Sequence, residues 1–143
     1  MIDSILLVDD EDLFHLVFED SCSLLDITLS LRSLNSADEA AKLFAEWHKD
    51  PTNRPECVFV DLNIIGSSFD GIELIRKVNF EYGNHVVIGI ISSSNEPEEQ
   101  AKAVQAGAQF WIIKSDEIEP RLEEFKKDYD GFKNRTQGFK VYK

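Results

Sequence analysis

The sequence lacks the features of membrane-spanning, secreted and zinc-thiolate proteins. No apolar run approaches the ~20 residues that a transmembrane helix needs. The first residues show neither the basic nor the apolar segment of a signal peptide. The only cysteines, Cys22 and Cys57, match no CxxC or zinc spacing. We therefore expect a cytoplasmic protein with two reduced thiols and no membrane contact.

Basic residues are also scarce. The 143 residues include 15 lysines and arginines against 27 aspartates and glutamates, which gives a net charge of −12. A chain this acidic is a poor ligand for duplex nucleic acid, so nucleic acid is not among the expected partners. The exception is the tail, residues 131–143, which holds four basic residues and no acids. The histidines His15, His48 and His85 show no metal-binding spacing.

Short apolar segments alternate with amphipathic ones along the chain, and the two patterns predict strands and helices. The predicted strands are residues 5–8, 27–31, 57–60, 86–91 and 110–113. The predicted helices begin near Asp12, at a capping box Ser36–Glu39, after Asp70-Gly71, at Pro97 and at Ile118. Gly107 is expected to end the fourth helix. Five such units with short connections predict one α/β domain, a doubly wound parallel sheet of five strands with helices on both faces.

Charged residues follow three of the apolar strands directly. Asp9 and Asp10 close the first run, Asp61 closes the run 57–60, and Lys114 closes the run 110–113. The carboxyl ends of parallel strands meet at one edge of the sheet, where open α/β sheets bind their ligands. The sequence therefore predicts three carboxylates and one ammonium group at that edge.

Carboxylates placed this close together repel one another. Each pair costs ~4 kcal/mol at a separation of ~4 Å and an effective dielectric constant of ~20. An Asp-Asp pair taken alone is more often a solvated turn, but a packed cluster requires a cation or a shared proton. Hard oxygen ligands with room for water suit Mg²⁺. The metal interpretation is therefore preferred to the acidic turn.

A carboxylate beside such a metal can act as a nucleophile. Asp61 alone could simply cap a turn, but beside Mg²⁺ it can accept a phosphoryl group as an aspartyl-phosphate. The ammonium of Lys114 emerges at the same edge and can pair with phosphoryl oxygens. Ser92, at the end of the fourth strand, is either a turn residue or a hydrogen-bond donor to that group.

Taken together, these residues resemble the receiver domain of two-component response regulators, the CheY-like family, over residues 4 to about 130. The resemblance implies a flavodoxin-like fold with strand order 2-1-3-4-5. Its landmarks are Ile5-Leu6-Leu7-Val8-Asp9-Asp10-Glu11, Val58-Phe59-Val60-Asp61, Asp70-Gly71, Ser92 and Gly107-Ala108-x-x-Trp111-x-x-Lys114.

The resemblance gives the residues around the phosphoryl group their roles. Asp61 would be the phosphoacceptor, and Ser92 and Lys114 would hold the phosphoryl group. Trp111 stands where the family has its switch aromatic, usually a tyrosine or phenylalanine. Ser115 follows Lys114 in place of the usual proline.

The resemblance also implies a Mg²⁺ site. Asp10 and Asp61 would bind the ion directly, Asp9 largely through water, and Asn63 through its backbone carbonyl. The loop that follows Asp61 is two residues longer than the family pattern, and Ile65 replaces a common proline. These differences bear on donor access and on the lifetime of the phosphoryl group.

The expected protein is a single-domain response regulator. Residues 1–130 would form the receiver, and residues 131–143 a short basic extension, frayed or docked or a partner-binding arm, with no output domain. The donor would be a histidine kinase or phosphotransfer protein. The target would be a protein that binds the face of the fourth helix, fifth strand and last helix. The receiver itself would be a monomer or a phosphorylation-dependent dimer. The only catalysis expected is self-phosphorylation and autodephosphorylation. The alternatives are an aspartyl-phosphate-forming phosphatase and a receiver-like binding module that works without phosphorylation.

Overall fold

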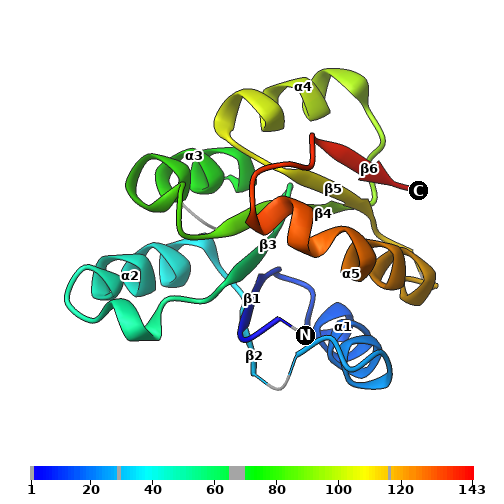
Figure 1. Ribbon diagram of the computed structural model, residues 1–143, viewed down its shortest axis with the longest axis horizontal. Coiled ribbons are helices and arrows are strands. Elements are labelled where there is room, and N and C mark those ends of the chain that lie inside the picture. Colours follow the sequence, from blue (N-terminus) through cyan, green and yellow to red (C-terminus); the bar gives the residue numbers. More distant parts are fainter. Residues whose placement is uncertain (1, 29, 65–69, 116) are drawn as a thin grey trace.

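The strands form one parallel sheet in the spatial order β2-β1-β3-β4-β5-β6 (Figure 1). The computed structural model describes residues 2–28, 30–64, 70–115 and 117–143. The strands of these regions are β1 (Ile5–Val8), β2 (Leu31–Leu34), β3 (Cys57–Asp61), β4 (Val87–Ser92), β5 (Phe110–Ile113) and β6 (Lys140–Tyr142). The predicted order 2-1-3-4-5 is confirmed, and a sixth strand is added beside β5.

Within the described residues, five helices connect the strands and lie on both faces of the sheet (Figure 1). They are α1 (Asp12–Leu24), α2 (Ala37–Trp47), α3 (Gly71–Tyr82), α4 (Pro97–Ala106) and α5 (Glu119–Lys133), with a short 3₁₀ turn at Pro51–Asn53. Side chains of α2, α3 and α4 join one buried cluster, and those of α1 and α5 join another. None of the described helices has both the length and the apolar character that a membrane span requires.

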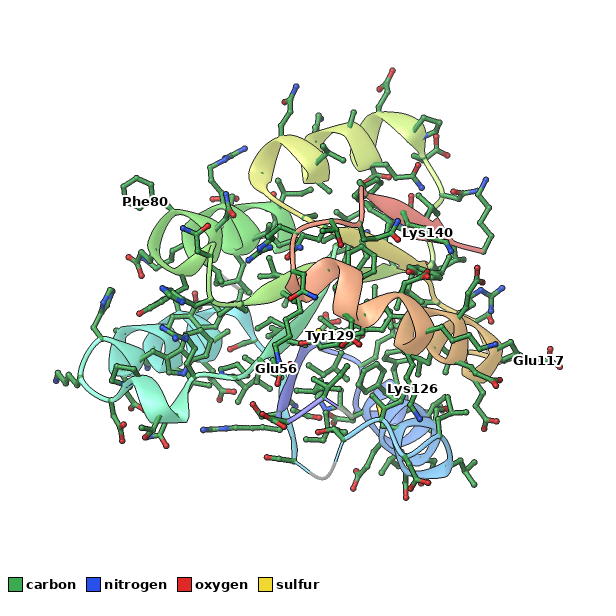
Figure 2. The ribbon with its side chains drawn as sticks, in the orientation of Figure 1. Glu56, Phe80, Glu117, Lys126, Tyr129 and Lys140 are labelled. Carbon is green, nitrogen blue, oxygen red and sulfur yellow. The ribbon has the colours of Figure 1, made fainter. Side chains whose placement is uncertain are left out.

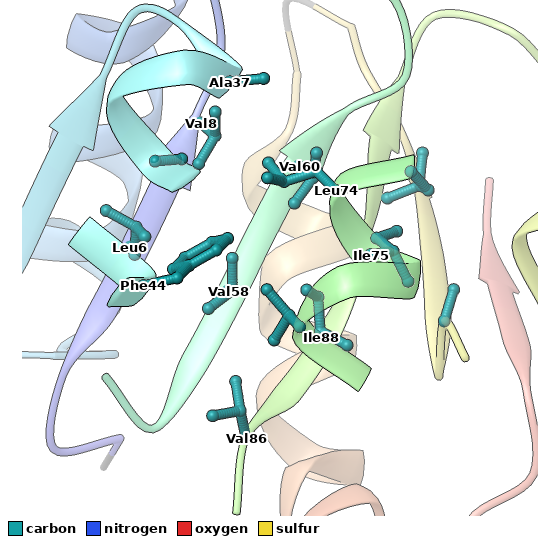
Figure 3. Packing of buried hydrophobic residues seen from close by; sticks show 14 of the residues in the cluster. Leu6, Val8, Ala37, Phe44, Val58, Val60, Leu74, Ile75, Val86 and Ile88 are labelled. Carbon is teal, nitrogen blue, oxygen red and sulfur yellow. The ribbon is translucent and has the colours of Figure 1, made fainter. Parts of the chain in front are cut away.

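The sheet separates the two buried clusters because successive side chains of a strand point to opposite faces. On the side of α2 and α3, Val58 and Val60 of β3 pack with Phe44, Leu74 and Ile75 (Figure 3). All five side chains are 0% exposed. Continuous burial on both faces explains why these strands are short apolar runs in the sequence.

The second cluster is aromatic. Phe59 of β3 lies at its centre, with ring centroids 5.0 Å from Phe18, 5.1 Å from Phe110 and 5.3 Å from Phe125. Edge-on and tilted ring pairs at these separations add to the free energy gained by burial. The cluster fixes α1 and α5 against the sheet, and with them the residues that follow β1 and β5.

Several predicted helix ends are confirmed. The Ser36 hydroxyl accepts a hydrogen bond from the Glu39 N–H at 3.1 Å. Pro97 stands in the first turn of α4, and Gly107 ends that helix in the left-handed conformation with φ 113°. A fully reciprocal capping box occurs at Asp70 and Glu73, the first turn of α3.

The second strand begins later than predicted. The alternation over residues 27–31 predicted a strand there, but β2 starts at Leu31, opposite Ile5 of β1. Asp26 adopts the left-handed conformation with φ 50°, and Ile27 then fills the core as a fully buried residue. Residue 29, which belonged to the predicted alternation, lies outside the described part of the chain.

The prediction of five strands is also wrong in number, because residues of the basic tail extend the sheet. Lys140 to Tyr142 pair in parallel with Phe110 to Ile112. A strand of three residues is too short to give a period-two pattern, and Lys140 in the strand and Lys143 after it make the segment look polar. The sixth strand is therefore a correction to the predicted sheet.

Candidate functional site

The predicted charged residues meet at the carboxyl edge of the sheet. Asp9 follows β1, Asp61 ends β3 and Lys114 follows β5. The Lys114 Nζ lies 2.8 Å from Asp9 Oδ2 and 3.9 Å from Asp61 Oδ2. The structure therefore brings together two of the three predicted acids around the lysine.

Glu11 joins this group, although its place in the sequence predicts no role for its side chain. Its Oε1 lies 3.0 Å from the Lys114 Nζ, while its side chain stays 64% exposed. One carboxylate oxygen each from Asp9, Glu11 and Asp61 lie within 4.8 Å of one another. The only signal in the sequence is the position of Glu11 directly after the two aspartates.

The Asp9 carboxylate is completely buried and firmly oriented. Its Oδ1 accepts a hydrogen bond from the Glu11 N–H at 2.8 Å. Its Oδ2 contacts the Lys114 ammonium but accepts no well-directed hydrogen bond from the described residues. His15, one helical turn into α1, places Nε2 2.5 Å from the Asp9 backbone carbonyl oxygen. Burial raises the pKa of Asp9, although Lys114 and the Glu11 N–H oppose the rise.

Asp61 is the most strongly perturbed carboxyl group of the site. Burial and repulsion from Asp9 raise its pKa to about 7, with a smaller contribution from Asp10. Attraction to Lys114 and a hydrogen bond from the backbone N–H of Asn63 act in the opposite direction. Near neutral pH both the protonated and the ionised form of this carboxyl group are therefore populated.

Lys114 is held as a cation. Burial lowers the pKa of its ammonium, but the close contact with the Asp9 carboxylate and the charge of Asp61 raise it by more, so the net shift is upward. Its Nζ also lies 4.4 Å from the centroid of the Phe14 ring. A depression of about 370 Å³ beside it is lined by Phe14, Ser93 and Ser115, among others, and opens the ammonium to solvent.

The donor set fits a hard divalent cation. Carboxylate oxygens are the preferred ligands of such ions, and the buried Asp9 Oδ2 points into the cluster without a well-directed donor. A cation would also offset the repulsion that raises the pKa of Asp61. Asp10 is half-buried, and Asn63 is exposed beside Asp61. Their assignment as ligands stays a prediction, and residues 65–69 of the long loop, Ile65 included, lie outside the described regions.

Hydrogen bonds connect Ser92 to Trp111 through one loop residue. Ser92, at the end of β4, is 1% exposed, and its Oγ accepts from the Ser94 N–H at 3.1 Å. The Trp111 Nε1–H donates to the Ser94 carbonyl oxygen at 3.0 Å. Despite its bulk Trp111 is completely buried. A displacement of Ser92 would therefore reach the tryptophan through the Ser94 backbone.

Comparisons with known proteins agree with this geometry. Residues 5–123 match the family model of the response regulator receiver domain. No curated protein matches the chain. Among solved structures, NtrX from Brucella abortus aligns with a TM-score of 0.77 and 24% identity over 94% of this chain. The chain spans only 29% of the length of NtrX.

Two further solved structures cover most of both chains. The signal receiver domain of an HD domain-containing protein from Pseudomonas fluorescens Pf-5 has a TM-score of 0.73 and 18% identity, over 94% of this chain and 99% of that one. The response regulator RPA3017 in red light signaling of R. palustris has a TM-score of 0.71 and 19% identity, over 91% and 93%. At these identities the likeness concerns the fold.

Proposed function

The chain belongs to the response regulator receiver domain family, and from that membership we propose that it accepts a phosphoryl group on Asp61. The donor is the phosphohistidine of a histidine kinase or a phosphotransfer protein. The observation that carries the proposal is the position of the Asp61 carboxylate, 8% exposed at the end of β3 and 3.9 Å from the Lys114 ammonium.

The transfer forms one bond and breaks another. An Asp61 oxygen bonds to phosphorus while the bond from phosphorus to the donor's histidine nitrogen breaks, and the nitrogen keeps the electron pair. Only the ionised carboxylate can attack, so the raised pKa of Asp61 limits the reaction near neutral pH unless positive charge is added. Lys114 supplies part of that charge and pairs with the phosphoryl oxygens.

A Mg²⁺ ion, when bound, neutralises charge on the carboxylates and on the transferring group. Asp10 and Asp61 would hold it directly, Asp9 through water and Asn63 through its backbone carbonyl. Asp9 keeps Lys114 oriented, since its Oδ2 lies 2.8 Å from the ammonium. Catalysis by this chain is confined to its own phosphorylation and dephosphorylation.

The phosphorylated state acts on other proteins through the face of α4, β5 and α5. Ser92 donates its hydroxyl to a phosphoryl oxygen on Asp61. That movement pulls on Ser94, whose carbonyl accepts from Trp111 of β5. The switch therefore ends in the strand at the centre of this face. The protein works in the cytoplasm as a monomer or a phosphorylation-dependent dimer, without nucleic acid or membrane as a partner.

The test is direct labelling of the acceptor. Incubation with acetyl phosphate and Mg²⁺ should add one phosphoryl group that hydroxylamine removes. The Asp61→Asn variant should take up none, whereas Asp130→Asn, an exposed aspartate on α5, should be labelled like the unmodified protein. Normal labelling of Asp61→Asn would show that another residue is the acceptor.

A further inference from the structure

Strand β6 covers the edge of β5 that a five-stranded sheet would leave open. It runs parallel to β5, with Phe110 opposite Lys140 and Trp111 opposite Val141. In Figure 1 the red strand β6 lies directly beside β5, between α4 and α5. Helix α5 therefore serves as the crossover of an additional β-α-β unit. The face of α4, β5 and α5 is thus covered along the edge of β5 by a segment of the same chain.

Alternate side chains fasten this segment to both layers of the domain. Phe139 and Val141 are partly buried against the cluster under α2, α3 and α4. Tyr142 belongs to the other cluster, is 1% exposed, and packs edge-on against Phe125 with ring centroids 5.8 Å apart. Its hydroxyl donates to Asp128 Oδ2 at 2.7 Å. Tyr142 is therefore the main anchor of β6.

A basic residue adds a charged contact on the side of α5. The Lys140 Nζ lies 2.8 Å from Asp128 and 3.0 Å from Glu124 (Lys140 is labelled in Figure 2). These ion pairs are partly exposed, so they contribute more to the specificity of the β5 edge for the strand that it binds than to the affinity. The edge of β5 therefore selects a strand with a lysine and a tyrosine two positions apart.

The attachment of β6 is local. The strand has three residues and pairs with β5, whose other side is held by β4. The Arg135 side chain donates to the Val86 backbone carbonyl at 3.2 Å and so fixes the start of the connection. Beyond it, a Cβ added at Gly138 would meet nothing within 4 Å. A strand of three residues that is paired along one edge can open without unfolding the rest of a domain.

We propose that residues 136–143, which include β6, form a displaceable strap. They detach as a unit and expose the β5 edge as a strand-accepting surface for a protein target. The surface takes an extended segment that runs parallel to β5 and carries the lysine-x-tyrosine pattern of the resident strand. In the resting state the chain's own segment fills the edge and excludes competitors.

The strap is coupled to the site through Trp111, and this step rests on the proposed function. Trp111 pairs with Ile90 of β4 on one side and with Val141 of β6 on the other. Its indole also donates to the carbonyl of Ser94, whose N–H donates to the Ser92 hydroxyl. A phosphoryl group that moves the serine therefore alters the strand against which β6 pairs. Phosphoryl binding and release of the strap bias each other by the same factor.

Backbone hydrogen exchange measured by mass spectrometry tests whether the strap opens locally. Amides of β6 should exchange roughly tenfold or more faster than those of β3, yet slower than those of a free peptide of residues 134–143. In Tyr142→Ala the β6 amides should reach the rate of the free peptide while β3 and β4 stay protected. Lys143→Ala, at an exposed position next to the strand, should change nothing.

Exchange of β6 as slow as that of β3 would overturn the proposal, because the strand would then open only with the whole domain. If Tyr142→Ala unfolds the protein, Tyr142→Phe keeps the ring and loses only the hydroxyl contact with Asp128. Faster exchange confined to β6 in that variant supports the strap, and an equal change throughout the sheet contradicts it.

A labelled synthetic peptide of residues 134–143 tests the vacated surface. It should bind Tyr142→Ala saturably, and bind the unmodified protein at least roughly tenfold more weakly, because the edge is occupied there. The same peptide with alanine for Tyr142 should not bind. Equal binding to both proteins, or a β6 exchanged between two copies in the unmodified protein, would overturn the intramolecular strap.

The peptide experiment does not depend on phosphorylation, so it separates the two proposals. If Asp61 is not labelled, β6 exchange and peptide binding keep their expected values. If Asp61 is labelled, Mg²⁺ with beryllofluoride should change β6 exchange roughly threefold or more. Unchanged exchange in the loaded protein would contradict the coupling.

Discussion

The two ends of strand β3 carry carboxylates in opposite electrostatic situations. Glu56, just before the strand, accepts hydrogen bonds from the Asp3 N–H at 3.1 Å and the Tyr129 hydroxyl at 3.0 Å, and pairs with Lys133 at 3.1 Å. Figure 2 shows Glu56 and Tyr129 side by side. Burial raises the pKa of Glu56, but these donors outweigh it and the net shift is downward.

Asp61, at the other end of the same strand, lacks such compensation. Burial and Asp9 raise its pKa to about 7, and Lys114 offsets this only in part. The difference separates an edge of the domain that is stabilised within the chain from an edge that is prepared for a ligand. The amino edge of the sheet is satisfied within the chain, whereas the carboxyl edge keeps an excess of negative charge that an added cation would relieve.

The largest expected effect comes from removing the unbalanced charge. In metal-free buffer at about pH 8, Asp61→Asn should raise the free energy of unfolding by about 2–4 kcal/mol, since ionising a group whose folded pKa is raised opposes folding. The gain should vanish as the pH falls below about 4, where the carboxyl is protonated in both states. Urea unfolding measures it, with Asp130→Asn as the control. A destabilised Asp61→Asn would mean that this edge is already compensated.

The opposite end of β3 should respond with the opposite sign. Glu56→Gln removes the ion pair with Lys133 and weakens the hydrogen bonds from Asp3 and Tyr129, so the free energy of unfolding should fall by about 1–2 kcal/mol. Because the folded pKa of Glu56 is lowered, this contribution is lost as the pH falls through that value, and the two proteins should converge in acid. Equal stability of Glu56→Gln and the unmodified protein at neutral pH would contradict the difference between the two ends.

A smaller effect is expected at Asp10, whose charge adds to the repulsion on Asp61 but which does not carry the acceptor role. Asp10→Ala should raise the free energy of unfolding in metal-free buffer by about 0.5–1 kcal/mol, because it relieves part of the repulsion on Asp61. It should also weaken Mg²⁺ binding and phosphorylation together. Calorimetric Mg²⁺ titration and thermal melts check both. An unchanged or lower melting point without Mg²⁺ would show that Asp10 does not add to the repulsion on Asp61.

The sequence predicts the position of Asp61 at the ligand edge, but it does not predict the contacts of Glu56. Asp61 follows a continuous apolar run, and the topology of parallel strands places such a residue at the ligand edge. Glu56 lies between a proline-containing loop and the strand, and no local sequence pattern predicts its contacts with Tyr129 and Lys133. These contacts are made by α5, more than 70 residues away in the chain, and depend on how the helix packs.

The missed elements have similar causes. The alternation of apolar residues predicts strand β2 at residues 27–31, but pairing with the four residues of β1 decides where the strand lies. Strand β6 depends on an edge that only the folded sheet provides, with Tyr142 as its anchor. Glu11 entered the site because its backbone N–H binds Asp9 and its side chain then reaches Lys114. Tertiary contacts, not local pattern, fix the two strands and the contact of Glu11 with Lys114.

The most direct test of the central claim is the ionisation of Asp61 itself. Carbon-13 NMR of the labelled aspartate carboxyl groups, assigned with Asp61→Asn, gives its pKa with and without Mg²⁺. Without metal the Asp61 carboxyl should titrate at about 7, and saturating Mg²⁺ should lower that pKa markedly, because the ion favours the carboxylate. A pKa near the ordinary aspartate value of about 4, unchanged by Mg²⁺, would contradict the account.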